Sequence, residues 1–226
     1  YAVKFQLFNV DKLFSKEILK KSLTHRKRVR WELNENFIPK IAKECKKVGI
    51  KFGCTPFYLE AVDILQPYVD FYKISSYEIL WKDLLIKCAK TKKPIMFSTG
   101  MANLKEIQEA YNTIKKNGPE DITIFHCISE YPANTNHPNL NFINTIKKKF
   151  NAKIGWSDHT RDKLFLNSIS NCFKLDAVEF HLDLDGKGYE YKSGHCWLPK
   201  EISEIINSIN NFQKQLNFKT NKKKLS

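Results

Sequence analysis

The chain has 226 residues, of which 42% are hydrophobic, 13% aromatic and 27% charged. This composition excludes an intrinsically disordered chain, and no apolar run reaches the roughly 18 residues that a membrane-spanning helix requires. We therefore expect a cytoplasmic protein without a membrane partner, with one domain in residues 1–216 and a polar tail or linker in residues 217–226.

The formal net charge is +14, and a protein this basic could bind the phosphate backbone of nucleic acid. However, the lysine runs at 147–149 and 222–224 lie at the end of a predicted helix and in the tail, where solvated lysines are common. Aromatic residues such as Phe97, Phe125 and Phe180 lie inside strand patterns and are not expected at the surface. Nucleic-acid binding stays an alternative function, and we expect no nucleic-acid partner.

The six cysteines are scattered without a CxxC pair. This spacing favours neither a zinc ribbon nor a compact disulfide framework. We expect reduced and mostly buried thiols.

Short apolar runs alternate with longer amphipathic stretches along the chain. Strands are expected at residues 2–6, 50–54, 71–75, 95–99, 122–127, 153–157 and 177–182. Helices are expected near residues 35–48, 57–67, 81–91, 102–117, 139–149, 161–174 and 200–216. This alternation is typical of parallel sheets built from βαβ units.

The fold class we expect is α/β, a (β/α)8 TIM barrel. Seven strands do not close an eight-stranded barrel, and the first begins at residue 2, so we expect the barrel to be truncated at its N-terminus with its first strand missing. An open doubly wound sheet is the structural alternative. The first strand is not followed by the glycine-rich phosphate loop that would support it.

Polar side chains gather where the predicted strands end, which is where the active site of a parallel barrel lies. Strand alternation places Lys4 and Gln6 on one face of the first strand, and Lys73 lies at a comparable depth in the third. Two interior lysines are costly to desolvate unless they meet an anion. The sequence therefore predicts an anionic ligand.

Small hydroxyl side chains follow several of the same strands. They are Thr55, Ser98, Ser129 and Ser157. Each one alone is explained by capping of the following helix, but four together favour a site for phosphate or carboxylate oxygens.

Two histidines end consecutive strands. His159 follows the strand at 153–157, and His181 lies near the end of the strand at 177–182. Adjacent strands are about 4.8 Å apart, so both imidazoles can reach one divalent cation. The neighbouring Asp158 and Glu179 are candidate partners of these rings, although Glu179 is equally consistent with a residue of the barrel interior. His126 lies inside an apolar strand and is expected to be a core residue.

These motifs, taken in order and spacing, resemble the N-acetylneuraminate synthase family from residue 1 to about 210. The matching segments are Lys4-Phe5-Gln6, Thr55-Pro56-Phe57, the stretch from Tyr72 to Glu78, Ser98-Thr99-Gly100-Met101, His126-Cys127 through Tyr131-Pro132, Ser157-Asp158-His159-Thr160 and Glu179-Phe180-His181. Each motif alone is weak, whereas seven in register along seven strands are specific.

The resemblance implies an enzyme that condenses phosphoenolpyruvate with an N-acetylmannosamine-type sugar aldehyde, as a homodimer in its full-length form. It implies a divalent metal, manganese, bound by His159 and His181. The expected catalytic residues are Lys4, Lys73 and Glu78, and the expected substrate-binding residues are Gln6, Thr55, Ser76, Ser98, Ser129, Tyr131 and Ser157.

The chain departs from the family pattern in features that concern the sugar. The family's glutamate from its first strand and the arginine of its C-terminal antifreeze-like domain are not in this sequence, and Ser129 stands where many members carry asparagine. The Gly-Pro-Asp segment that usually follows the second histidine is replaced by residues 186–197. Legionaminate and pseudaminate synthases, which act on diacetamido sugars, are therefore alternatives. Related 3-deoxy-sugar-acid synthases recruit a cysteine and carboxylates to their metal, and the histidine pair argues against them.

Overall fold

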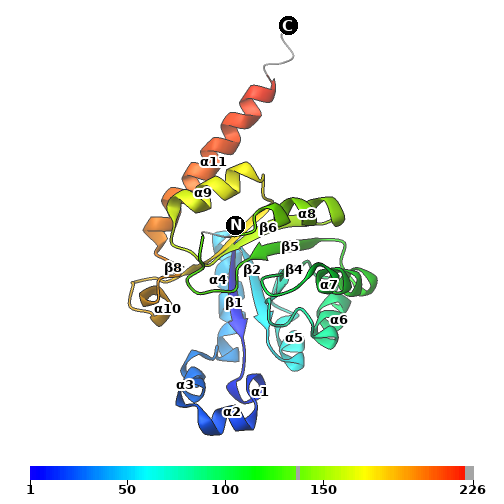
Figure 1. Cartoon of the computed structure of the whole chain (residues 1–226). Coiled ribbons are helices and arrows are strands. Elements are labelled where there is room, and N and C mark those ends of the chain that lie inside the picture. The colour runs from blue at the N-terminus through cyan, green and yellow to red at the C-terminus, as the bar shows by residue number, and fades with distance from the viewer. Residues whose placement is uncertain (136–137, 222–226) are drawn as a thin grey trace. The chain divides into compact units, whose positions relative to one another are not determined.

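The computed structural model describes residues 1–135 and 138–221, which divide into two compact units, Tyr1–Ile122 and Thr123–Ser226. Strands and helices alternate along the chain in both units (Figure 1). The lysine run at 222–224 lies outside the described residues. No helix in the described part of the chain is long and apolar enough to cross a membrane.

Unit 1 is built on four parallel strands that pair in sequence order. They are β1 (Ala2–Leu7), β2 (Lys51–Pro56), β3 (Phe71–Ile74) and β4 (Ile95–Ser98). Its longer helices are α4 (Ile38–Val48), α5 (Leu59–Leu65), α6 (Lys82–Lys90) and α7 (Leu104–Asn117). Figure 1 shows α5, α6 and α7 side by side along the strands, and the fully buried Phe52, Tyr72 and Phe97 form part of the core beneath them.

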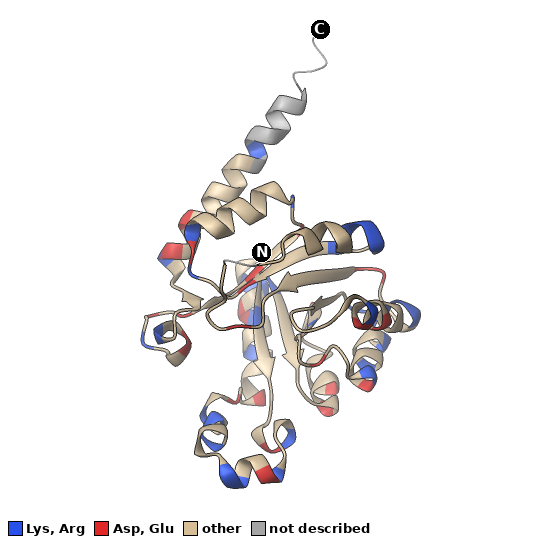
Figure 2. Cartoon of the chain, in the orientation of Figure 1, with Lys and Arg blue, Asp and Glu red and all other residues tan. Residues whose placement is uncertain are grey.

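A series of short helices connects β1 to α4. They are α1 (Val10–Leu13), α2 (Lys16–Lys21), α3 (Leu23–Arg26), η1 (Lys27–Trp31) and η2 (Glu35–Phe37). The sequence did not predict most of them, because none is long enough to show a helical apolar period. Lys and Arg are frequent in this segment, whereas acidic and basic residues are interleaved on α5, α6 and α7 (Figure 2).

Unit 2 also carries four parallel strands in sequence order. They are β5 (Ile122–Cys127), β6 (Lys153–Asp158), β7 (Ala177–Leu182) and β8 (Cys196–Trp197). The helices are α8 (Asn141–Lys149), α9 (Lys163–Cys172), α10 (Tyr189–Lys192) and α11 (Pro199–Asn221). Helix α9 packs against α11, and the fully buried Trp156 and Trp197 are the largest core side chains of the unit.

The seven predicted strands are all present, but the count of seven was wrong. An eighth strand, β8, pairs with β7. It has only two residues and therefore shows no alternation in the sequence. Helix α11 continues to Asn221, beyond its predicted end near residue 216. As predicted, the cysteines are free thiols, and all are buried except Cys172.

Candidate active site

The ammonium group of Lys73 is buried at the end of β3 in unit 1. The side chain is 3% exposed, and its Nζ donates hydrogen bonds to Ser98 Oγ at 2.5 Å and to the carbonyl oxygen of Ile74 at 3.3 Å. Ser98 is the last residue of β4, and β3 pairs with β4 in register. The parallel pairing of two strands therefore fixes a cation beside a hydroxyl at their C-terminal ends.

Thr55 provides a buried hydroxyl that the protein leaves without a partner. The residue is 1% exposed, and its Oγ1 makes no hydrogen bond. Thr55 and Lys73 each directly follow the paired residues Cys54 and Tyr72 of β2 and β3. A buried hydroxyl without a partner costs about 1 to 3 kcal/mol, so this group calls for a ligand that accepts its hydrogen bond.

Two more predicted residues lie in the turn that follows β3. Ser76 is buried, and its Oγ accepts a hydrogen bond from the backbone N–H of Gly100 at 3.0 Å. The carboxylate of Glu78 is also buried and accepts a hydrogen bond from the hydroxyl of Ser75. Burial raises the pKa of Glu78, while the hydrogen bond from Ser75 and the charge of Lys73 oppose that rise. Glu78 can therefore hold a proton more readily than an exposed glutamate.

The two predicted residues of β1 are more open. Lys4 is half-buried and Gln6 is exposed, and the register of β1 with β2 places Gln6 beside Thr55. Because paired residues of a parallel ladder point to the same face, Gln6 and Thr55 share one face of the sheet.

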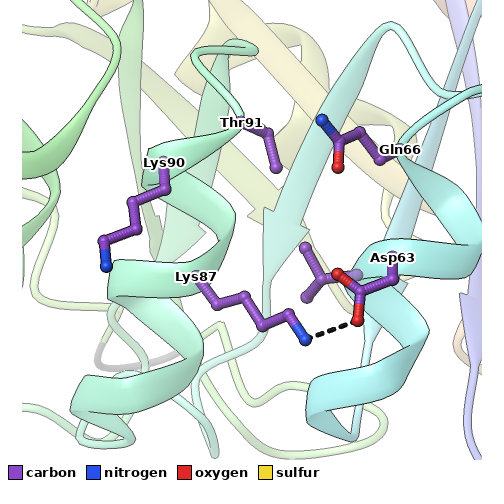
Figure 3. Close-up of a pocket in the computed structure, with 6 residues that line it drawn as sticks. Asp63, Gln66, Lys87, Lys90 and Thr91 are labelled. Carbon is purple, nitrogen blue, oxygen red and sulfur yellow. Dashed lines mark hydrogen bonds and ion pairs between the residues drawn. The ribbon is translucent and has the colours of Figure 1, made fainter.

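Two hollows lie in unit 1, at opposite ends of its strands. One, of about 170 Å³, lies between the C-terminal ends of α5 and α6, where Lys87 Nζ is 2.6 Å from Asp63 Oδ2 (Figure 3). The other, of about 360 Å³, follows the end of β1 and includes Asn9, Glu32 and Tyr58 in its wall. Barrel enzymes have their active sites at the C-terminal ends of the strands. The hollow in Figure 3 lies at the N-terminal ends of the strands and is therefore not the expected catalytic site.

In unit 2, His159 is held in one orientation by the backbone. Its Nδ1 is 2.6 Å from the carbonyl oxygen of Ile128. A carbonyl oxygen only accepts hydrogen bonds, so Nδ1 carries a proton and donates a hydrogen bond to it. Nε2 then carries the lone pair, which is the arrangement found in histidines that bind metals. The ring of Tyr131 lies over His159, with 4.1 Å between the ring centroids.

His181 lies beside His159, as the sequence predicted. Strand pairing sets Ser157 against Glu179, two residues before each histidine, and the two imidazole centroids are 5.4 Å apart. Ser157 Oγ donates a hydrogen bond to Glu179 Oε2 at 2.8 Å. Glu179 therefore contacts the predicted substrate residue Ser157, on the same face of the sheet.

Asp158 does not support either histidine. Its carboxylate is fully buried and accepts hydrogen bonds from Trp156 Nε1 at 3.1 Å, Trp197 Nε1 at 3.3 Å and both the N–H and the hydroxyl of Thr160. The suggestion that Asp158 partners an imidazole was therefore wrong. This carboxylate ties β8 to β6 through the two indoles.

A second group of ligand-type side chains surrounds His181, and the sequence reasoning did not assign it. Within the described residues, ligand atoms of His181, Glu190, His195 and Cys196 all lie within 4.8 Å of one another. Glu190 Oε2 is 3.3 Å from His181 Nδ1, 3.9 Å from His195 Nε2 and 3.7 Å from Cys196 Sγ. The sequence signal was the Gly194-His195-Cys196-Trp197 segment, which was noted only as a replacement of the family pattern.

The pKa values in this group differ because His195 and Cys196 are buried, whereas Glu190 is exposed. The hydrogen bond from His181 lowers the pKa of Glu190 to about 2, whereas burial lowers the pKa of His195. Burial, together with the nearby Glu190 carboxylate, raises the pKa of the Cys196 thiol to about 12. Without a cation the group therefore holds one carboxylate, a protonated thiol and a buried imidazole that favours its neutral form.

Two remaining site predictions fall on the loop after β5. Ser129 Oγ is a buried hydroxyl without a hydrogen-bond partner, as Thr55 is in unit 1. Tyr131 is 43% exposed, and its ring also approaches His181 and His195, at centroid distances of 5.9 and 5.2 Å. His126 is buried between Phe142 and Trp156, as predicted for a core histidine.

The profile of the NeuB family matches residues 1–221. The chain belongs to the NeuB family. Residues of this chain are 36% identical to the uncharacterized protein MJ1065 of Methanocaldococcus jannaschii, over 95% of this chain and 63% of that protein. The N,N'-diacetyllegionaminic acid synthase of Campylobacter jejuni is 39% identical over 76% of this chain and 52% of its own length. The chain thus spans between about half and two thirds of the length of these NeuB relatives.

A solved structure supports the same assignment. The crystal structure of the N-acetylneuraminic acid synthetase of Leptospira borgpetersenii, in complex with citrate, superposes with a TM-score of 0.85 at 26% identity. The match covers 95% of this chain and 74% of that one. The predicted fold class, an α/β barrel of the N-acetylneuraminate synthase type, is confirmed by this similarity and by the NeuB family match.

Proposed function

We propose that this chain forms the reaction centre of a nonulosonic acid synthase, which joins phosphoenolpyruvate to an acetamido sugar aldehyde. Membership of the NeuB family supports a sugar-acid synthase. The main observation behind the proposal is the buried ammonium of Lys73, which donates a hydrogen bond to Ser98. On the neighbouring strand lies Thr55, whose buried hydroxyl has no hydrogen-bond partner. A buried cation among hydroxyls suits a small, strongly anionic substrate.

The phosphoenolpyruvate anion is assigned to the lysines and hydroxyls. Lys73 and Lys4 would offset the charge of its phosphate and carboxylate, and Thr55 would donate its unused hydroxyl hydrogen. Ser76 and Ser98 would add hydroxyls, and Ser157 is assigned to the same ligand from the family resemblance. Glu78, with its raised pKa, would exchange a proton with the reacting groups.

His159 and His181 would hold a divalent cation, and the donor set fits this role. Both rings end parallel strands, and the carbonyl of Ile128 fixes the tautomer of His159 so that Nε2 is a donor to metal. When bound, the cation would act as a Lewis acid toward the sugar aldehyde. Manganese is our proposal from the family resemblance. Tyr131 and Ser129 would contact the sugar, and Gln6 would support the pocket beside Thr55.

The reaction balances without a further reactant. C3 of phosphoenolpyruvate bonds to the aldehyde carbon, and the aldehyde oxygen gains a proton. Water adds to C2 as a hydroxyl, and its other proton balances the one gained by the aldehyde oxygen. The bond between C2 and the phosphate oxygen then breaks, the C2 hydroxyl becomes the ketone, and its proton leaves with phosphate. Preorganised ammonium groups stabilise charge that moves during these steps, which is the electrostatic contribution that commonly dominates catalysis.

The sugar substrate is proposed from the named relatives. Relatives named N,N'-diacetyllegionaminic acid synthase occur in Campylobacter jejuni and Legionella pneumophila, at 39% and 34% identity. A relative in Drosophila melanogaster named N-acetylneuraminate-9-phosphate synthase is 26% identical. A diacetamido sugar is therefore the first substrate to test, followed by N-acetylmannosamine. The homodimer and the cytoplasmic location stay predictions, and membership of the NeuB family does not favour nucleic-acid binding.

The test is a coupled assay of the intact protein with phosphoenolpyruvate, Mn²⁺ and single candidate sugars. We expect phosphate release that depends on one acetamido aldose, with a nine-carbon acid detected by mass spectrometry. Absence of sugar-dependent release with the mono- and diacetamido sugars would refute the proposal.

A further inference from the structure

We propose that His181, Glu190, His195 and Cys196 form a four-ligand site for a thiophilic divalent cation such as Zn²⁺. The site lies at the junction of β7 with the segment that leads through α10 to β8. It goes beyond the proposed histidine pair, because three of its four ligands come from this segment and have no role in the reaction set out above.

The distances around Glu190 match those between ligands of one metal ion. Ligands about 2.0 to 2.3 Å from a tetrahedral cation are separated from one another by about 3.3 to 3.8 Å. Glu190 Oε2 lies 3.3, 3.9 and 3.7 Å from the ligand atoms of His181, His195 and Cys196. The separations to His181 and Cys196 lie within that range, and the one to His195 lies just above it. Because all four ligand atoms lie within 4.8 Å of one another, the cluster is compact enough to share one cation.

The backbone holds the ligands in these positions. The ladder between β7 and β8 sets His181 directly opposite Cys196. Gly194 has a φ of +92°, a conformation that favours glycine, and it turns the chain from α10 into β8 just before His195. His195 Nδ1 lies 3.1 Å from Ser193 Oγ, and its Nε2 is the nitrogen that faces Glu190. His195 and Cys196 are 5% and 2% exposed, so two of the four ligands are buried.

The charges of the four ligands also suit a divalent cation. Binding displaces the thiol proton of Cys196 into solvent, and the thiolate and the Glu190 carboxylate then balance the two positive charges. Two imidazoles complete the set as neutral donors. A mixed nitrogen, oxygen and sulfur set selects Zn²⁺ or Co²⁺ over Mn²⁺, which favours oxygen ligands.

Occupancy would affect the neighbouring reaction centre through one residue. His181 belongs both to this set and to the pair proposed for the reaction, and its ring lies 5.4 Å from that of His159. A cation held by four protein ligands fills a tetrahedral shell and leaves no open position, as in structural zinc sites. A neutral imidazole has a single lone pair, so His181 binds one cation at a time. A cation in this set would therefore withdraw His181 from the pair with His159 and tie the segment after β7 to the sheet.

The test is a spectroscopic titration of the intact, chelator-treated protein with Co²⁺ under reducing, oxygen-free conditions. We expect a near-ultraviolet thiolate-to-cobalt charge-transfer band that saturates at one equivalent and disappears when Zn²⁺ is added. Cys196→Ser should abolish the band, and Glu190→Gln should weaken cobalt binding by at least about 10-fold. Glu190 is exposed, so the glutamine variant should fold even if the serine variant does not.

Two further variants separate this site from other thiols and from the proposed reaction centre. Cys172→Ser removes the exposed free thiol of the same unit and should leave the band intact. His159→Ala should also keep the band, although it removes a ligand of the proposed reaction site. Absence of the band at saturating Co²⁺, its survival in Cys196→Ser or its loss in His159→Ala would overturn the inference. The assay of sugar-dependent phosphate release is read separately, so either proposal can fail while the other holds.

Discussion

Replacement of Thr55 by valine is expected to stabilise the unliganded protein and to lower its affinity for phosphoenolpyruvate. The hydroxyl is buried in a residue that is 1% exposed and has no hydrogen-bond partner, so its removal relieves about 1 to 3 kcal/mol of desolvation cost. Valine keeps the shape and the β-branching that suit strand β2. Each kcal/mol corresponds to a rise in melting temperature of about 2 to 4 °C for a chain of this size.

The same substitution removes a donor to a charged ligand. A hydrogen bond of this kind contributes about 1.5 to 3 kcal/mol, so the affinity for phosphoenolpyruvate should fall roughly 10- to 150-fold. Differential scanning calorimetry and isothermal titration calorimetry would measure the two effects on one preparation.

A matched control exists in the same unit. Thr91 carries a hydroxyl that donates to the carbonyl of Cys88 at 2.6 Å, at the hollow in Figure 3. Thr91→Val should lower the free energy of unfolding by about 0.5 to 1.5 kcal/mol and leave ligand affinity unchanged. Equal destabilisation by both substitutions, or an unchanged affinity of Thr55→Val for phosphoenolpyruvate, would refute the proposal that the Thr55 hydroxyl binds substrate.

Three further substitutions test other parts of the account. Lys73→Met should reduce phosphoenolpyruvate affinity on the order of 100-fold by calorimetry, while Lys87→Met, which removes an exposed ion pair, should leave it unchanged. Asp158→Asn should lower the free energy of unfolding, measured in denaturant, by about 1 to 3 kcal/mol, because the amide nitrogen would place a donor opposite an indole N–H. The control is Asp162→Asn at an exposed helix cap, which should change the free energy of unfolding by less than about 0.5 kcal/mol. Burial raises the pKa of Glu78 in the folded protein above its value in the unfolded chain, so the wild type should lose stability relative to Glu78→Gln as pH rises from the unfolded-chain pKa through the folded-state pKa. A difference in the free energy of unfolding that is the same at every pH would contradict this.

The sequence was sufficient for the parts of the fold that follow from local patterns. The segments at residues 2–6, 95–99 and 177–182 carry runs of apolar or β-branched residues, and the structure places strands at Ala2–Leu7, Ile95–Ser98 and Ala177–Leu182. Lys73 and Ser98 could be predicted as neighbours because consecutive parallel strands lie side by side. Such inferences need only periodicity and the rules of parallel sheets.

The parts that were missed depend on tertiary pairing. Strand β8 has two residues and shows no period, and its position opposite His181 follows from the turn at Gly194. Cys196 and Glu190 are six residues apart in the chain and meet because the chain turns at Gly194 between α10, which carries Glu190, and β8. The partners of Asp158 include the indole of Trp197, which comes from β8 and is 39 residues away in the chain, so its neighbours in sequence do not reveal this contact.

The proposed function, synthesis of a sugar acid from phosphoenolpyruvate, can be measured on the intact protein. The most direct measurement is product stoichiometry in the intact protein, with phosphate quantified by colorimetry and the organic acid by mass spectrometry. We expect one phosphate released per nine-carbon acid formed, with both products absent when the acetamido sugar is omitted. Phosphate release at the same rate with and without sugar, and no new acid, would contradict it.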